Sequence, residues 1–203
     1  MPEQYGGEGR TVTEVLLFHH AQGLTRGVQA FAEQPRAAGH SVHTPDLFDG
    51  HVFATLDEGI AYARQVGFEN VLERGVSAAD DLPADLVYAG FSLGVMPAQK
   101  LAQTRPGARG ALFFDACLPV AEFGKWPEGV PVQVHGMDGD PFFAGEGDID
   151  AARELVDSAP RAELFLYPGS AHLFADSSLP GYDEAAAALV MRRAIDLLAR
   201  IGR

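Results

Sequence analysis

The sequence predicts a single α/β domain built on a doubly wound, mostly parallel β-sheet. Short, uninterrupted apolar runs alternate along the chain with longer segments of helical period, and this alternation is typical of α/β folds. Continuous apolar runs indicate strands buried on both faces, as in a parallel sheet. The length of 203 residues fits one domain. In such sheets, functional sites form at the carboxyl ends of the strands.

Six strands are expected. Five are apolar runs bounded by Gly, Pro or Asp, which end strands and start turns. The sixth is a short segment that ends in the turn Thr44-Pro45-Asp46. In chain order the expected strands are Val15–Phe18, Ser41–His43, Leu86–Tyr88, Ala111–Phe114, Val130–Val134 and Leu164–Tyr167.

Helices are expected between these strands. The first starts at Thr25, a good N-cap residue, and ends before Gly39, a good residue for the C-terminal cap. Pro35 is expected to kink or shorten its last turn. Asp57 is expected to cap a second helix that runs through Gly67, with another helical piece after it.

Three further helices complete the pattern. One covers Val95–Thr104, and Pro97 fits its first turn because no N–H is needed there. Asp148 is expected to cap the next, which runs through Val156. The last helix is the clearest, because apolar residues recur at helical spacing. These residues are Ala187, Met191, Ala194, Ile195 and Leu198.

The composition excludes several classes of protein. Apolar residues make up 47% of the chain, which is enough for a folded core. Lys and Arg number 15 against 28 Asp and Glu, and the net charge of −13 would repel nucleic acid and anionic membranes. No apolar run is long enough to span a membrane. The single Cys117 excludes an intrachain disulfide and fits a reducing compartment.

The first residues differ from the rest of the chain. Residues 1–10 are polar and Gly-rich, without the apolar core of a signal peptide. We therefore expect a flexible N-terminus over 1–10, one domain over 11–203, and a cytoplasmic location. The sequence does not predict the oligomeric state.

The strongest functional signal is the motif Gly90-Phe91-Ser92-Leu93-Gly94. It follows an expected strand and precedes an expected helix, which is the context of the G-x-S-x-G nucleophile elbow. The sharp turn exposes the Ser92 hydroxyl at the N-terminus of the helix, where the backbone amides favour negative charge. A plain Gly-rich turn is the simpler alternative. The context favours a nucleophile.

A serine nucleophile needs a base and an acid that orients the base. In elbow hydrolases the chain order is Ser, then acid, then His, and His172 lies in the loop after the last expected strand. The other downstream histidine, His135, precedes the candidate acids. Asp138 and Asp140 both follow the fifth strand; we favour Asp140, because Pro141 would pin its loop. Both could instead be turn residues.

Other kinds of site have little support. His40 and His43 do not form a metal-ligand pattern, and no spaced Cys/His set exists. Neither Gly-rich phosphate-binding motif is present. We expect no metal, no cofactor, no nucleic-acid partner and no membrane partner. Cys117 is expected to be a buried apolar thiol.

The sequence resembles the dienelactone hydrolase family of the α/β-hydrolase superfamily over nearly all of the chain after its first ten residues. Beside the elbow, several segments carry the resemblance. They are His20–Leu24, Ala38-Gly39-His40 leading to Pro45-Asp46-Leu47-Phe48, Asp140-Pro141-Phe142, Tyr167-Pro168-Gly169 and His172-Leu173-Phe174. The resemblance implies an α/β-hydrolase fold and supports Asp140, since the family's acid usually precedes a proline or an aromatic residue in such a loop.

Two departures from the family pattern concern the substrate. The members that give the family its name carry Cys at the nucleophile position, where this chain has Ser92. They also place Glu in the early loop, at the position of His20. The resemblance therefore implies a hydrolase related to general esterases, and it leaves the preference between lactones and linear esters open.

The elbow also predicts the remaining parts of the site. The backbone amides of Leu93 and Ala21 are expected to form the oxyanion hole. His19 and His20 flank that loop; either one lines the pocket, or both are structural. No segment is long enough for a lid, because the stretch from Ala116 to Gly129 reads as a loop with Pro and Gly. The side chains expected to line the substrate pocket are His20, Trp126, Phe142, Phe143 and Phe174.

Together these features predict a serine hydrolase that acts on a small ester or lactone through a covalent acyl-enzyme. Two other functions remain open. One is a thioesterase or acyltransferase with the same triad. The other is a non-catalytic binding protein of the same fold, which the intact Ser, His and Asp disfavour.

Overall fold

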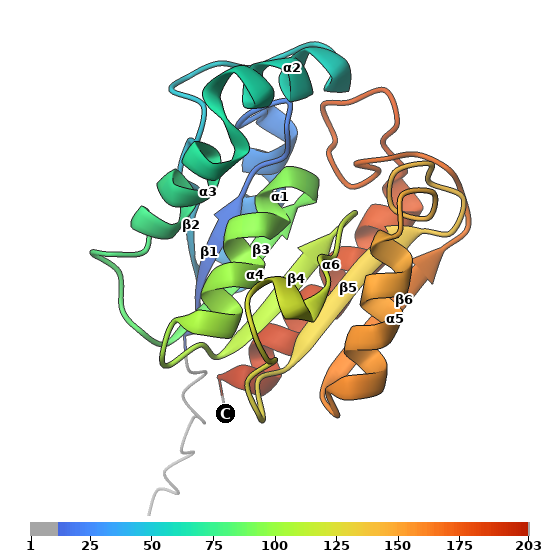
Figure 1. Cartoon of the computed structure of the whole chain (residues 1–203). Helices are drawn as coiled ribbons and strands as arrows, with labels where there is room; N and C mark the ends of the chain where they lie inside the picture. The colour runs from blue at the N-terminus through green and yellow to red at the C-terminus, as the bar shows by residue number, and fades with distance from the viewer. Residues whose placement is uncertain (1–11, 203) are drawn as a thin grey trace, which may run out of the picture.

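The computed structural model describes residues 12–202, so the expected flexible segment 1–10 lies outside the described residues. It contains one parallel six-stranded sheet with helices on both faces, the arrangement predicted from the sequence (Figure 1). The strands are β1 (Glu14–Phe18), β2 (Ser41–His43), β3 (Leu86–Phe91), β4 (Gly110–Phe114), β5 (Val132–Met137) and β6 (Ala162–Tyr167). The α-helices are α1 (Arg26–Ala37), α2 (Leu56–Val66), α3 (Phe68–Ser77), α4 (Val95–Thr104), α5 (Asp148–Ser158) and α6 (Glu184–Ile201).

The strand order is β2-β1-β3-β4-β5-β6. The chain therefore moves from β1 outward to β2, returns to β3, and then continues in the opposite direction. The carboxyl ends of β1 and β3 flank the point at which this direction reverses, and ligands of such sheets bind there. The loop after β1 and the turn after β3 meet at this point.

Two apolar layers hold the helices on the sheet. Successive strand residues point to opposite faces, so Leu16 and Phe18 belong to the apolar layer that includes residues of α2, α3, α4 and α5, while Val15 and Leu17 belong to the layer that includes residues of α1 and α6. Figure 1 shows α4 in front of the sheet and α6 behind it. Burial of both faces explains why the strands read as unbroken apolar runs.

Most of the expected elements are present, with shifted ends. The fifth strand starts at Val132 and continues to Met137, so it lies further along the chain than expected. Pro35 lies inside α1, and the helix continues past it to Ala37. Thr25 caps α1 as predicted, and its hydroxyl accepts from the Val28 N–H at 3.1 Å.

Two expected helix caps are wrong. The second helix is capped by Thr55, not by Asp57, because Thr55 and Glu58 form a capping box. The Thr55 hydroxyl accepts from the Glu58 N–H at 3.3 Å, and the Glu58 carboxylate accepts from the Thr55 N–H at 3.1 Å. Asp148 is the first residue of α5, and Gly147 occupies the cap position.

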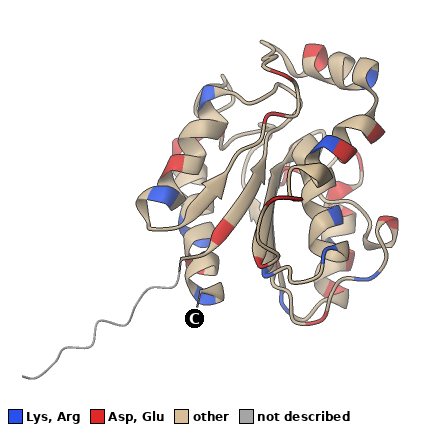
Figure 2. Ribbon diagram, turned by 90° about the vertical axis from the view of Figure 1, so that its left-hand side faces the viewer, with Lys and Arg blue, Asp and Glu red and all other residues tan. Residues whose placement is uncertain are grey.

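The charges are spread over the surface of the molecule. Figure 2 shows Asp and Glu on helices and loops, interspersed with Lys and Arg. Among residues 12–202, none of the helices combines the length and the apolarity needed to cross a membrane. The stretch between β4 and β5 holds one short 3-10 turn, η2 (Val120–Glu122), which agrees with the expected absence of a lid.

Candidate active site

Ser92 lies at the turn between β3 and α4, in a short 3-10 turn, η1 (Ser92–Gly94). Its φ of 46° lies in the left-handed region, which is rare for residues other than glycine. A Cβ atom on Gly90 would lie 2.2 Å from the Gly94 carbonyl oxygen. A Cβ atom on Gly94 would lie 2.6 Å from the carbonyl oxygens of Phe18 and His19, at the end of β1. Both flanking positions therefore require glycine, and the backbone holds the Ser92 side chain out of the turn.

His172 bridges Ser92 and Asp140. Its Nε2 lies 2.9 Å from Ser92 Oγ, and its Nδ1 lies 2.6 Å from Asp140 Oδ2. If Nδ1–H donates to the carboxylate, Nε2 accepts from the serine hydroxyl, which is the arrangement a general base needs. Asp140 is buried, and its other oxygen accepts from the Phe142 N–H at 2.9 Å. The three side chains come from the loops after β3, β5 and β6.

The charges around His172 favour its protonated form. Burial opposes the imidazolium, but the hydrogen bond that His172 donates to Asp140 and the charges of Asp115, Asp140 and Asp148 outweigh burial, so the pKa of His172 rises above 6.5. An imidazole with a raised pKa is a stronger base when it takes the serine proton. The same carboxylates stabilise the imidazolium that results.

The structure separates the two candidate acids. Asp138 is exposed, and its Oδ1 accepts from the Gly169 N–H at 3.2 Å, so it joins two loops. Asp140 is fully buried beside His172. The geometry therefore brings Asp140 to the histidine and leaves Asp138 in a turn.

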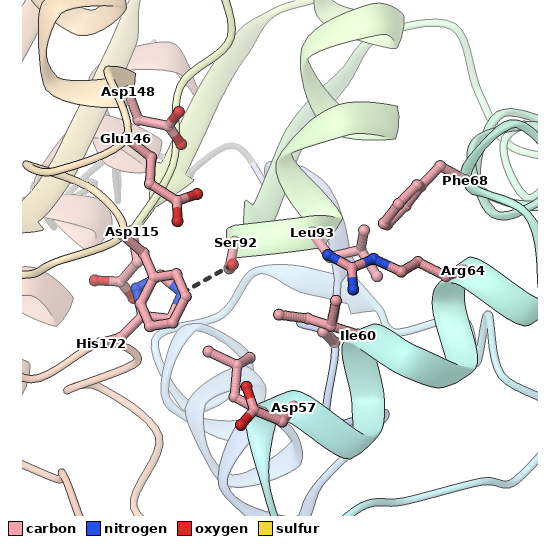
Figure 3. Close-up of a pocket in the computed structure, with 13 residues that line it drawn as sticks. Asp57, Ile60, Arg64, Phe68, Ser92, Leu93, Asp115, Glu146, Asp148 and His172 are labelled. Carbon is pink, nitrogen blue, oxygen red and sulfur yellow. Dashed lines mark hydrogen bonds between the residues drawn. The ribbon is translucent and has the colours of Figure 1, made fainter.

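A cavity of about 490 Å³ opens beside Ser92 and His172 (Figure 3). Ala21 and Leu93, whose amides are the expected oxyanion donors, both line it. The Phe142 ring also lines it and lies 4.8 Å, between ring centroids, from the His172 ring. Ser92, His172 and the two residues expected to supply the oxyanion donors thus face one space at the carboxyl edge of the sheet, an arrangement that suits acyl transfer.

Comparison with known proteins agrees with this geometry. The sequence profile of the dienelactone hydrolase family matches residues 5–202. The chain belongs to the dienelactone hydrolase family. Its members are hydrolases, and the esterases among the structural neighbours agree with that activity class. Among curated proteins, none matches the sequence.

Solved structures share the fold at low identity. A proposed dienelactone hydrolase from Klebsiella pneumoniae is 18% identical, with a TM-score of 0.71 over 96% of this chain and 90% of its own. A dienelactone hydrolase-like promiscuous phosphotriesterase from metagenomic libraries is 21% identical, with a TM-score of 0.70 over 97% and 89%. Thermogutta terrifontis esterase 2, phosphoramylated by tabun, is 17% identical, with a TM-score of 0.65 over 95% and 84%.

In this family member, the two histidines after β1 are both buried and lie outside the cavity. His20 Nε2 pairs with Asp176 at 2.8 Å, and its Nδ1 accepts from the Gln22 N–H at 3.2 Å. His19 Nδ1 lies 2.7 Å from the His20 carbonyl oxygen, and its Nε2 accepts from the Leu47 N–H. Burial lowers the pKa of His19 to about 4, so it is neutral. His20 is therefore a structural residue, contrary to its expected place in the substrate wall.

Three expected wall aromatics also lie away from the cavity. Phe143 is fully buried and fills the space over Gly136, where a Cβ would come within 2.4 Å of its ring. Phe174 is buried and packs 5.3 Å from Tyr167. Trp126 lies before β5, at the opposite end of the sheet, where its indole N–H donates to Val130. Of the expected aromatic residues, the structure brings only Phe142 to the cavity.

The sequence reasoning missed several residues that the structure places in the cavity. Asp115 directly follows β4, so its position at the carboxyl edge was a usable signal. Residues of α2 and the start of α3 form the opposite wall, and no local pattern marks them. These residues are Leu56, Asp57, Ile60, Arg64 and Phe68.

Proposed function

We propose that this protein hydrolyses small esters, with Ser92 as the nucleophile. The observation that carries the proposal is the continuous chain of contacts from Asp140 through His172 to Ser92, at 2.6 and 2.9 Å, beside a cavity. The strained backbone of Ser92 adds support, because strain of this kind is held at functional sites. The family and the esterases among its structural neighbours agree with this reaction class.

The reaction follows from the positions of these groups. Ser92 Oγ attacks the ester carbonyl carbon while its proton passes to His172 Nε2. The carbonyl oxygen becomes an oxyanion, which the amides of Ala21 and Leu93 would stabilise. The carbon–oxygen bond to the alcohol then breaks, and His172 returns the proton to the leaving oxygen. Water, deprotonated by His172, then attacks the acyl carbon; the bond from this carbon to Ser92 Oγ breaks, His172 returns the proton to Oγ, and the acid is released.

A fluorophosphonate probe tests the nucleophile, and a structural neighbour that is phosphonylated by sarin makes this chemistry a suitable choice. We expect the probe to label Ser92 and to stop hydrolysis of p-nitrophenyl acetate. Ser92→Ala should lose both labelling and about 10⁴-fold or more in kcat, while its melting temperature stays close to that of the parent. Near-parental turnover by this variant would overturn the proposal, and an unlabelled, inactive parent would favour a binding protein.

A further inference from the structure

Three carboxyl groups lie on one side of the cavity. Asp115, Glu146 and Asp148 all line it, on the His172 side of Ser92 (Figure 3). The opposite side carries Leu93 and α2 side chains. The cavity therefore has an acidic wall, defined as Asp115, Glu146 and Asp148, and a separate wall that is apolar apart from Asp57 and Arg64.

Asp115 is the unusual member of this acidic wall. It is 1% exposed, and neither of its carboxylate oxygens has a hydrogen-bond partner among residues 12–202. Its backbone is in the left-handed region, with φ of 60°. A buried polar group without a partner is costly. The loop after β4 nevertheless holds this carboxyl group near His172 at the edge of the cavity, where a bound cation would offset its charge.

Burial makes two carboxyl groups of the acidic wall, Asp115 and Asp148, harder to ionise. It raises the pKa of Asp115 to about 7 and the pKa of Asp148 to about 6. A cation in the cavity would stabilise the ionised form of both groups. No three His, Cys, Asp or Glu side chains in the described part of the chain are arranged to hold a metal ion. An organic cation fits the negative charge of this acidic wall.

The position of His172 indicates which part of an ester meets the acidic wall. His172 must return its proton to the leaving oxygen, so the alcohol part of the substrate lies on the His172 side of Ser92. The acyl part then lies toward Leu93, Ile60 and Phe68 on the other wall. This assignment rests on the proposed function.

We propose that the substrates are esters of a short apolar acid with an amino alcohol, whose protonated amine binds the acidic wall at Asp115 and Asp148. The amine also acts on the reaction itself. Carboxylates near Ser92 oppose the negative charge that develops on the oxyanion, and a bound ammonium group offsets them. A neutral alcohol of the same shape lacks this effect.

Two esters of equal shape test the proposal. 2-(Dimethylamino)ethyl butyrate carries a protonated amine, and 3-methylbutyl butyrate replaces the nitrogen with carbon. The ratio of their kcat/KM values, cationic ester over neutral ester, is divided by the ratio of their alkaline hydrolysis rates. The result, the corrected ratio, is free of the difference in intrinsic reactivity. We expect the parent to prefer the cationic ester by about tenfold or more, as one charge-assisted contact allows.

The variants assign this preference to the acidic wall. Asp115→Asn and Asp148→Asn should each lower the corrected ratio severalfold, and Asn tolerates the backbone of residue 115. Asp196→Asn is the matched control, because this exposed aspartate on α6 lies away from the cavity and its loss changes the net charge equally. The corrected ratio of the control should equal that of the parent.

The outcomes separate this inference from the proposed function. Hydrolysis of both esters with a corrected ratio of one or less, or a ratio that both cavity variants leave unchanged, would overturn the inference alone. An equal fall in the control would assign the preference to net charge and would also overturn it. Failure to hydrolyse either ester, together with no labelling of Ser92, would overturn the proposed function and this inference with it.

Discussion

At the scale of single residues, three aspartates act on one imidazole. Asp140, Asp115 and Asp148 together hold the pKa of His172 above 6.5 despite its burial. Attack requires the neutral imidazole, so we expect kcat/KM for 3-methylbutyl butyrate to rise with pH through a midpoint above about 6.5. The midpoint describes the coupled groups rather than His172 alone.

Asp115→Asn tests the direction of this shift. Without the negative charge of Asp115, the imidazolium is less stable, so the midpoint of the pH profile should move to lower pH. Profiles of parent and variant from about pH 5 to about pH 9 bracket the histidine range. A midpoint that stays in place or moves upward would contradict the electrostatic role of Asp115.

The choice between two neighbouring aspartates gives a second prediction at this scale. Asp140→Asn removes the anion that orients and stabilises His172, and should lower kcat by about 10³–10⁴-fold. Asp138→Asn changes an exposed turn residue that accepts one backbone N–H, and should lower kcat by less than about tenfold. The paired kcat values decide the matter, and a larger loss in the Asp138 variant would reverse the assignment.

The sequence predicted these residues with uneven success. The order of Ser92, Asp140 and His172 along the strand pattern predicted that these side chains lie close together, as they do, because each follows a strand and the carboxyl ends of parallel strands share an edge. The expected aromatic wall was wrong for Trp126, Phe143 and Phe174. Residue type reports a tendency to be buried, but burial in the core and burial against a ligand look the same in sequence.

At the scale of secondary-structure elements, α2 positions the loop after β1. Gly59 lies on the face of α2 that packs against Ala21, and a Cβ there would lie 1.9 Å from the Ala21 carbonyl oxygen. The sequence predicted the helix but not this contact, because a helical pattern gives the buried face and not the element it meets. The loop that carries an expected oxyanion donor thus depends on a glycine in a separate element, the helix α2.

Gly59→Ala tests this dependence. Alanine favours the helix over glycine, but its methyl group would push the Ala21 loop away and should lower kcat by about tenfold or more through a misplaced oxyanion donor. Ala61→Gly is the control: residue 61 is exposed on the same helix, and this change weakens the helix without touching Ala21. Equal kcat in parent and Gly59→Ala, measured on p-nitrophenyl acetate, would mean that the loop is held by other contacts.

At the scale of the whole molecule, the sheet could be predicted because it is the part of the fold that burial dictates. Strands covered on both faces must be apolar throughout, and the order of strands and helices along the chain leaves few topologies. The cavity could not be predicted in the same way. It lies between the carboxyl edge of the sheet and α2, and its walls come from segments that are far apart in the chain.

The size of this cavity leads to the last prediction. The stretch 116–129 between β4 and β5 supplies only the short turn η2, so no inserted layer extends the cavity of about 490 Å³. Its apolar wall, Leu56, Ile60, Leu93 and Phe68, is interrupted by Asp57 and Arg64. Burial of a long acyl chain needs a matching length of apolar wall, and each methylene left in water forgoes about 0.8 kcal/mol of binding free energy.

We therefore expect kcat/KM for p-nitrophenyl esters to be highest for acetate to hexanoate and to fall for dodecanoate and hexadecanoate. Assays below the micelle-forming concentration of each ester keep the comparison sound, and a steady rise in kcat/KM toward the long chains would show that the chain finds an apolar surface outside this cavity.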